Sequence, residues 1–363
     1  MTQMNEGMFS EVDEEPAKEK AANRIKIRFS LFFDGTLNNR TNVLEGVDSQ
    51  AYKDAKSSIG LFNDIWGVGS FENALSNIAK MEEYVNKSTD NYVFATYIEG
   101  QGTTNFKADS FQGKALGIAK TGVTQRAKKG LLEVLSQLNE LNKSIIIEKL
   151  TIDVFGFSRG AAAARNFLHQ AMNTKSRGRV PVRSLKQRIE SIGFEIDKLE
   201  IEFAGLFDTV SSVGPPISHK WNSRQLNLDA ISYAKDVVHL AAAEEYRKNF
   251  SLTNTNSAGD KEIYLPGVHS DIGGGYPDNY DESGLVVYKG LQNEVETEKS
   301  RLENSGWFSP GQLEAVEPPT YRSVQQNKIW KLQIKERIVK NEYDKIPLHI
   351  MAEFARESGI DLL

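Results

Sequence analysis

Apolar residues gather in short runs along the chain, and most runs end in polar or glycine-rich turns. Continuous or alternating apolar runs predict five strands, at residues 24–33, 91–98, 144–155, 199–207 and 261–268. Repeats at three or four residues predict helices over 124–142 and 348–357, and over 70–85 with Ser70 as the cap. Strands that alternate with helices favour the α/β class, with a mostly parallel central sheet and helices on both faces.

The remaining segments are more polar or less regular. Residues 1–23 are mostly acidic and lack the apolar run of a signal peptide, so we expect a flexible tail. The alanine-rich stretch 236–247 predicts a helix, and the charged residues 289–345 predict a helical extension. We expect residues 24–363 to form a single domain with a lid or insertion at 40–90.

Four predicted strands are each followed by a polar residue that carries chemistry. These residues are Asp34, Ser158, Asp208 and His269. Because the carboxyl ends of parallel strands share one edge of the sheet, we expect the four side chains to meet there. Residues 156–160 read Gly-Phe-Ser-Arg-Gly, a Gly-x-Ser-x-Gly pattern between a predicted strand and an alanine-rich helix. That context is typical of a nucleophile elbow, with the serine as nucleophile.

A serine nucleophile needs a neighbouring base, and the base needs an acid to orient it. Ser158, Asp208 and His269 follow the chain order of α/β-hydrolases, which is serine, acid, histidine. Asp271 is the second candidate acid. It lies so close to His269 in the chain that a role in shaping the glycine loop fits it better.

The other four histidines are weaker candidates for the base. His219 follows a Pro-Pro turn soon after Asp208 and is the strongest rival. His239 falls within the helix predicted over 236–247, where packing is its expected role. His169 lies roughly 16 Å along the elbow helix from the serine. His349 lies in the last predicted helix.

The developing negative charge of an acyl transfer requires preorganised N–H donors. We expect the backbone of Arg159, the residue after the nucleophile, to supply one. Gly35 is the candidate for the other, within the turn Asp34-Gly35-Thr36 that ends the first strand. Asp34 and Thr36 would support that turn. The alternative is that these three residues only terminate the strand.

Aromatic residues in the predicted insertion have two interpretations. They could line an acyl site or lid, or pack in the core, and core packing is the more common role. They are Phe62, Trp66 and Phe71.

Composition excludes several classes of function. The chain has 363 residues, 39% of them hydrophobic, and a net charge of −5, which gives no reason to expect nucleic acid as a partner. It contains no cysteine and no metal-ligand spacing, so we expect neither a metal nor a cofactor. A phosphatase of the Asp-x-Asp-Gly-Thr type needs a carboxylate where Phe32 stands. No apolar run is long enough to span a membrane.

Several blocks of sequence together resemble the DUF2235 family, which holds the Tle1-type phospholipase effectors of bacterial type VI secretion. The blocks are FFDGTLNN (32–39), YIEGQGT (97–103), GFSRGAAAAR (156–165), GLFDTVSSVG (205–214), AAAEEYRKNF (241–250) and PGVHSDIGGGY (266–276).

The resemblance implies an α/β-hydrolase core with Ser158 as nucleophile, Asp208 as acid and His269 as base. It implies an antibacterial phospholipase without a cofactor. Such an effector is made in the cytoplasm and exported to the target-cell periplasm. Its partners would be a secretion-system spike or adaptor and an immunity protein.

The chain departs from the family after Tyr276, where a short, charged part replaces a long region associated with membrane binding. Two alternatives therefore stay open: a small-ester or lysophospholipid hydrolase without membrane action, and a non-catalytic interaction module with the same fold.

Overall fold

The structure is a computed structural model that describes residues 23–59, 68–109, 122–174, 182–211, 226–245, 251–256, 261–318 and 328–363. The chain divides into two compact units, where we expected a single domain. We call them the sheet unit, Met1–Gly275 with Asp344–Leu363, and the small unit, Tyr276–Tyr343. The small unit has its own apolar core, which is the physical reason for the division.

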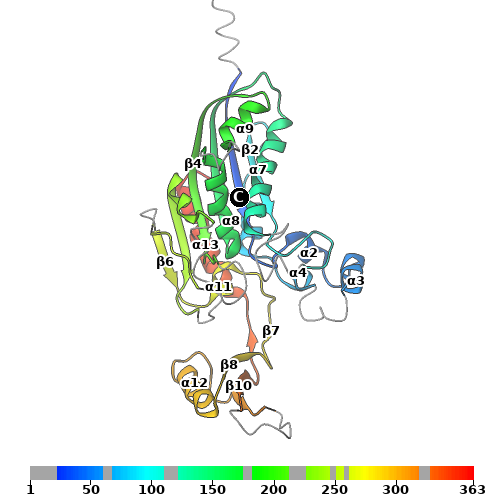
Figure 1. Cartoon of the computed structure of the whole chain (residues 1–363), viewed down its shortest axis with the longest axis vertical. Coiled ribbons are helices and arrows are strands. Elements are labelled where there is room, and N and C mark those ends of the chain that lie inside the picture. The colour runs from blue at the N-terminus through cyan, green and yellow to red at the C-terminus, as the bar shows by residue number, and fades with distance from the viewer. Residues whose placement is uncertain are drawn as a thin grey trace, which may run out of the picture. The chain divides into compact units, whose positions relative to one another are not determined.

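The sheet unit is built on a parallel sheet of six strands in the order β2-β1-β3-β4-β5-β6 (Figure 1). The strands are β1 (Arg24–Phe33), β2 (Val93–Ile98), β3 (Ile146–Phe157), β4 (Glu195–Phe207), β5 (Ala234–Ala242) and β6 (Lys261–Leu265). This arrangement confirms the predicted α/β class.

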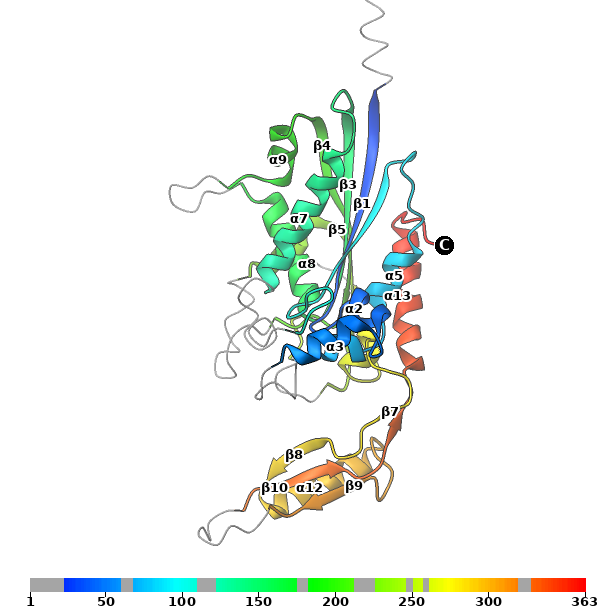
Figure 2. The same cartoon turned by 90° about the vertical axis from the view of Figure 1, so that its right-hand side faces the viewer.

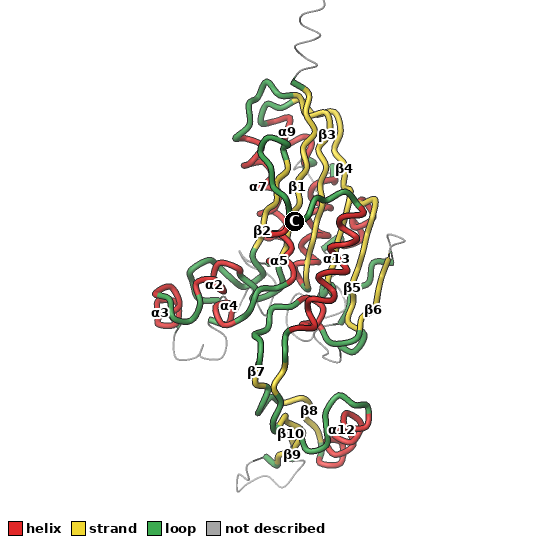
Figure 3. Tube along the Cα trace, turned by 180° about the vertical axis from the view of Figure 1, so that it is seen from behind, coloured by secondary structure: helices red, strands yellow, loops and turns green. Residues whose placement is uncertain are grey.

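Helices cover both faces of this sheet. One face carries α7 (Val123–Asn139), α8 (Arg159–Met172) and α9 (Leu185–Ser191), and the other carries α5 (Asn77–Tyr84) and α13 (Lys345–Glu357), as Figures 2 and 3 show. Each face has its own apolar cluster. Among the described residues, no helix has the length and apolar character that crossing a membrane requires.

Shorter elements follow the carboxyl ends of the strands. They are α2 (Arg40–Glu45), α3 (Gln50–Ser57), α4 (Gly69–Glu72), the 3-10 helix η1 (Leu228–Tyr233) and α11 (His269–Gly273). The helix predicted over 70–85 is in fact two helices. Ser76, rather than Ser70, caps the longer α5 by accepting the N–H of Ala79 at 3.2 Å.

The helix predicted over 236–247 is wrong, because this segment begins with the strand β5. Val237 and Val238 favour a strand, while the alanines that follow favour a helix. Burial decides between them: β5 lies between β4 and β6, and its last six residues are all buried. A short apolar run cannot be assigned to helix or strand from its periodicity alone.

The small unit corrects the prediction of a helical extension over 289–345. Among its described residues it holds one α-helix, α12 (Gln292–Asn304), with an antiparallel sheet in the order β8-β10-β9. The strands are β8 (Val286–Gly290), β9 (Leu313–Val316) and β10 (Trp330–Ile334), and a ribbon pairs β7 (Tyr280–Asp281) with β11 (Ile338–Val339). A short 3-10 helix, η3 (Glu342–Asp344), follows. The prediction of a helix rested on the charged composition of this stretch. Its apolar residues are spaced for strands as well as for a helix, so composition could not distinguish the two.

A buried ion pair ties β1 to β3 in the sheet unit. Asp153 is fully buried, and its carboxylate accepts from the Arg28 guanidinium at 2.6 and 2.9 Å. The same guanidinium donates to the carbonyl oxygens of Ser358 and Gly359 after α13. Burial raises the pKa of Asp153, and the bonds from Arg28 oppose that rise.

We predict that Arg28→Leu lowers the free energy of unfolding by about 3–5 kcal/mol, because it leaves the Asp153 charge buried without its partner. The matched control is Arg24→Leu, which removes a pair with Asp197 whose side chains are 38% and 42% exposed. That loss should stay below about 1 kcal/mol. Urea unfolding of both variants tests this, and equal losses would contradict it.

Candidate active site

The site lies where the sheet changes direction. β1 is flanked by β2 on one side and β3 on the other, so the loops that follow β1 and β3 leave in opposite directions. Asp34 directly follows β1 and Ser158 directly follows β3. In an open α/β sheet this point is the usual place for a ligand.

Ser158 adopts the strained backbone of a nucleophile elbow. Its φ of 57° and ψ of −125° place it in a region that non-glycine residues rarely occupy. Glycines make the turn possible. A Cβ on Gly160 would lie 2.2 Å from the carbonyl oxygen of Phe33, and one on Gly156 would lie 2.5 Å from the Cα of Ala161. The elbow predicted from residues 156–160 therefore has the expected strand-turn-helix geometry.

Asp208 and His269 form a buried pair. The Nδ1 of His269 lies 2.5 Å from Oδ2 of Asp208, and the two residues are 4% and 1% exposed. A carboxylate accepts, so Nδ1 carries the proton and Nε2 keeps a lone pair. The other oxygen, Oδ1, accepts the N–H of Ala242 at 2.9 Å. Asp208 thereby orients the imidazole from the end of β4.

Backbone contacts hold the elbow beside this pair. The N–H of Ser158 donates to the carbonyl of Phe207, just before Asp208, at 3.0 Å. The N–H of Val210 donates to the carbonyl of Ser158 at 3.2 Å. The Phe157 ring packs against the His269 ring at a tilt of 33°, with centroids 4.6 Å apart. The structure thus brings the predicted nucleophile, acid and base to one edge of the sheet.

Asp271 lies at the start of α11 and contacts the backbone just before the histidine. Its carboxylate accepts the N–H of Val268 at 2.8 Å at the start of α11. The carboxylate of Glu245 accepts the N–H of His269 at 3.1 Å. These contacts fix the backbone at His269.

The two N–H groups predicted as oxyanion donors, those of Arg159 and Gly35, differ in their hydrogen bonding in the structure. Arg159 begins α8, so its N–H is among the helix N–H groups that have no partner within the helix. The N–H of Gly35 instead donates to Oδ1 of Asp34 at 2.7 Å. The Gly35 N–H could donate to an oxyanion only after its hydrogen bond to Asp34 had broken.

Asp34 is a buried carboxylate beside the elbow. Its Oδ2 accepts from Tyr97 at 2.6 Å and from Ser76 at 2.8 Å. Burial raises its pKa from 3.8 to about 6, although these hydrogen bonds oppose the rise. Asp34 therefore connects the Asp34-Gly35-Thr36 turn to Ser76 and Tyr97.

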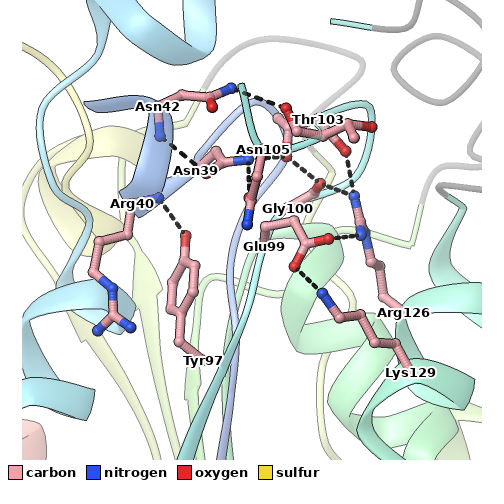
Figure 4. A network of polar contacts seen from close by, with 11 residues as sticks. Asn39, Arg40, Asn42, Tyr97, Glu99, Gly100, Thr103, Asn105, Arg126 and Lys129 are labelled. Carbon is pink, nitrogen blue, oxygen red and sulfur yellow. Dashed lines mark hydrogen bonds and ion pairs between the residues drawn. The ribbon is translucent and has the colours of Figure 1, made fainter. Parts of the chain in front are cut away.

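A polar network joins the loops after β1 and β2 (Figure 4). The Arg126 guanidinium donates to the carbonyls of Gly100 and Thr103 at 2.8 and 2.6 Å, and pairs with Glu99. Asn39 donates to the Thr103 hydroxyl at 3.2 Å. The loop that carries Asp34 is held in place by these contacts.

His239 has a role that the sequence did not indicate, because it lies in β5 and is fully buried. Its Nε2 accepts the N–H of Thr209 at 3.0 Å, so its Nδ1–H donates to Glu262 at 2.9 Å. That bond is the main reason why the pKa of Glu262 falls to about 2. His239 thus supports the turn that contains Asp208.

The remaining candidates lie elsewhere. Phe71 is buried in a small cluster with Ala55 and Val68, which favours core packing. His349 is exposed on α13. His219, Phe62 and Trp66 lie outside the described residues.

Comparison with known proteins adds two kinds of likeness. The family described as "T6SS, Phospholipase effector Tle1-like, catalytic domain" matches residues 169–294, which include Asp208 and His269 but not Ser158. A Tle1 effector solved bound to the VgrG spike of the type 6 secretion system matches with a TM-score of 0.58 and 23% identity. That match covers 94% of this chain and 74% of the other.

The chain resembles Tle1-type effectors. At 23% identity the structural likeness to Tle1 establishes the fold alone. The family match adds a likeness in sequence over the segment that contains Asp208 and His269. An uncharacterized protein from Pseudomonas aeruginosa also matches, with 20% identity, a TM-score of 0.47, and coverage of 96% of this chain and 48% of that one. The comparison with curated proteins found no match.

We predict a pH-dependent cost of burying Asp34. Its pKa is raised on folding, so its favourable contribution is complete below about pH 4 and is lost as the pH rises through about 6. A shift of about two units corresponds to about 3 kcal/mol. Unfolding wild type and Asp34→Asn in urea at several pH values measures this. The stability of wild type relative to the variant should fall with rising pH, and a constant difference would contradict the prediction.

We predict that His239→Leu destabilises the protein by about 1–3 kcal/mol more than His239→Gln. Leucine leaves the buried N–H of Thr209 without an acceptor, whereas the glutamine amide oxygen can take the place of Nε2. Urea unfolding of both variants is the measurement. If both lose the same stability, the bond to Thr209 contributes nothing.

Proposed function

We propose that this protein is a serine carboxylester hydrolase that releases fatty acid from glycerophospholipids. The buried Asp208–His269 pair beside the strained Ser158 carries this proposal. A carboxylate, an imidazole and a serine hydroxyl at one sheet edge suit nucleophilic acyl transfer.

In the proposed reaction His269 Nε2 removes the proton from Ser158 as its oxygen attacks the ester carbonyl. Asp208 holds the imidazole through Nδ1 and stabilises the imidazolium that forms. The Arg159 N–H, at the positive end of α8, stabilises the oxyanion. Collapse transfers the proton to the leaving alcohol and leaves an acyl-enzyme, which water then hydrolyses.

The lipid substrate and the biological role rest on the resemblance. The family match over residues 169–294 bears the name of a phospholipase effector, and the Tle1 structure was solved on its VgrG spike. By that likeness the protein would travel by type VI secretion on a spike or adaptor into the target-cell periplasm. A cognate immunity protein would protect the producing cell.

We predict that Ser158→Ala lowers kcat by on the order of 10⁶ and Asp208→Asn by on the order of 10⁴, because the three side chains act as one unit. Ser232→Ala, at an exposed serine of η1, is the matched control and should keep wild-type activity. Release of fatty acid from phosphatidylethanolamine vesicles and from a short-chain ester measures both effects.

Lipid mass spectrometry of the same reactions identifies the bond that breaks. We expect lysophospholipid and free fatty acid from wild type only. Detection of diacylglycerol and a soluble headgroup would instead show hydrolysis of a phosphodiester bond and would contradict the ester mechanism. Activity on the soluble ester alone would favour the small-ester hydrolase. Equal inertness of wild type and Ser158→Ala would favour the interaction module.

A further inference from the structure

Among the described residues, the Arg159 side chain beside the proposed nucleophile has no carboxylate partner. We propose that its guanidinium binds the phosphodiester oxygens of the substrate and makes Arg159 a specificity-determining residue. This inference rests on the proposed function, because it concerns the ligand of the same site. The Arg159 backbone N–H serves a separate purpose, so the two parts of the residue can be tested independently.

Two polar contacts hold Arg159 in place. Its Nε donates to the hydroxyl of Thr36 at 2.6 Å, which links it to the turn after β1. Its backbone carbonyl accepts from the fully buried side chain of Gln101 at 3.1 Å. The contact with Thr36 uses one edge of the guanidinium and leaves its terminal nitrogens to other partners.

Other arginines inside the sheet unit have their charge or their donors satisfied. Arg28 binds Asp153, and Arg126 binds Glu99. Arg165, buried in α8, donates to the carbonyls of Leu228, Thr253 and Asn254. In the part of the chain that the structure describes, the Arg159 side chain has no carboxylate partner and donates only to the neutral Thr36 hydroxyl. A partly buried guanidinium of this kind is suited to an anion that arrives with the substrate.

The electrostatic surroundings agree with this geometry. Burial lowers the pKa of Arg159 to about 10, and no carboxylate among the described residues opposes that effect. The nearest buried acid in the same turn, Asp34, already accepts from Gly35, Ser76 and Tyr97.

The position of Arg159 fits the covalent structure of a glycerophospholipid. Arg159 follows Ser158 directly, and the phosphate of such a lipid lies only a few bonds from its acyl esters. A planar guanidinium matches two phosphate oxygens better than an ammonium does. Binding the phosphate would therefore place an ester carbonyl near Ser158 and select phospholipids over neutral esters.

Binding without turnover gives the first test. In the Ser158→Ala background, calorimetry would compare monomeric dihexanoylphosphatidylcholine with dihexanoylglycerol, which has the same esters and no phosphate. Arg159→Gln should weaken binding of the phospholipid relative to the diacylglycerol by about 10- to 100-fold, as expected for a charge-assisted hydrogen bond. Arg159→Lys, which keeps the charge, should bind the phospholipid with an affinity between those of the Arg159 protein and the Arg159→Gln variant. An equal effect on both lipids would overturn the inference.

Two controls sharpen this test. Arg356→Gln, at an arginine whose side chain is 43% exposed on α13, should leave the ratio of the two affinities unchanged. Thr36→Val should weaken phospholipid binding in the same direction as Arg159→Gln, because it removes the contact that holds Nε. Circular dichroism of each variant verifies folding, and Arg159→Lys serves if the glutamine variant does not fold.

Inorganic phosphate distinguishes a headgroup from a free anion. Weak or undetectable binding of phosphate would support the headgroup assignment. Binding as tight as that of the phospholipid, and lost in Arg159→Gln, would assign a free-phosphate site instead and overturn it. Because these measurements need no hydrolysis, they stand even if the ester reaction proposed for Ser158 fails.

Discussion

The site depends on one close contact between backbones. The first turn of α8 lies against the end of β1, and no side chain fits between Gly160 and the carbonyls of Phe33 and Asp34. This contact places the strained Ser158 beside the turn that carries Asp34. The parallel register of β3 and β4 then sets Asp208 one strand further along. The arrangement of the site therefore depends on the lack of a side chain at Gly160 as well as on the polar residues.

Around that contact the protein manages buried charge in different ways. Asp153 receives a full ion pair from Arg28, whereas Asp34 receives only neutral donors and has a raised pKa. The two histidines of the site each pair with a carboxylate, His269 with Asp208 and His239 with Glu262. His239 also accepts the N–H of Thr209. Among the described residues the Arg159 side chain contacts only the neutral Thr36 hydroxyl, and we propose a ligand anion as the partner of its charge.

Much of this could be predicted from sequence because strand ends are local signals. An apolar run followed by Asp34, Ser158 or Asp208 is read without any knowledge of the tertiary structure, and parallel pairing then brings the residues together. β5 was missed because its alanines favour a helix until neighbouring strands bury them. The bonds of His239 and Gly35 depend on atoms distant in sequence or on one loop's geometry, which no periodicity encodes.

The order of the two units along the chain bears on when the fold around the site is completed during synthesis. The small unit separates the last helix of the sheet unit, α13, from the strands that it covers. During synthesis the face buried by Met351 and Ala355 stays open until the ribosome has passed residue 343, well after Ser158, Asp208 and His269 have emerged. The hydrogen bonds from Arg28 to the carbonyls of Ser358 and Gly359 can likewise form only after those residues have been made. The helical cover of that face is thus added after all six strands of the sheet and the three site residues have been made.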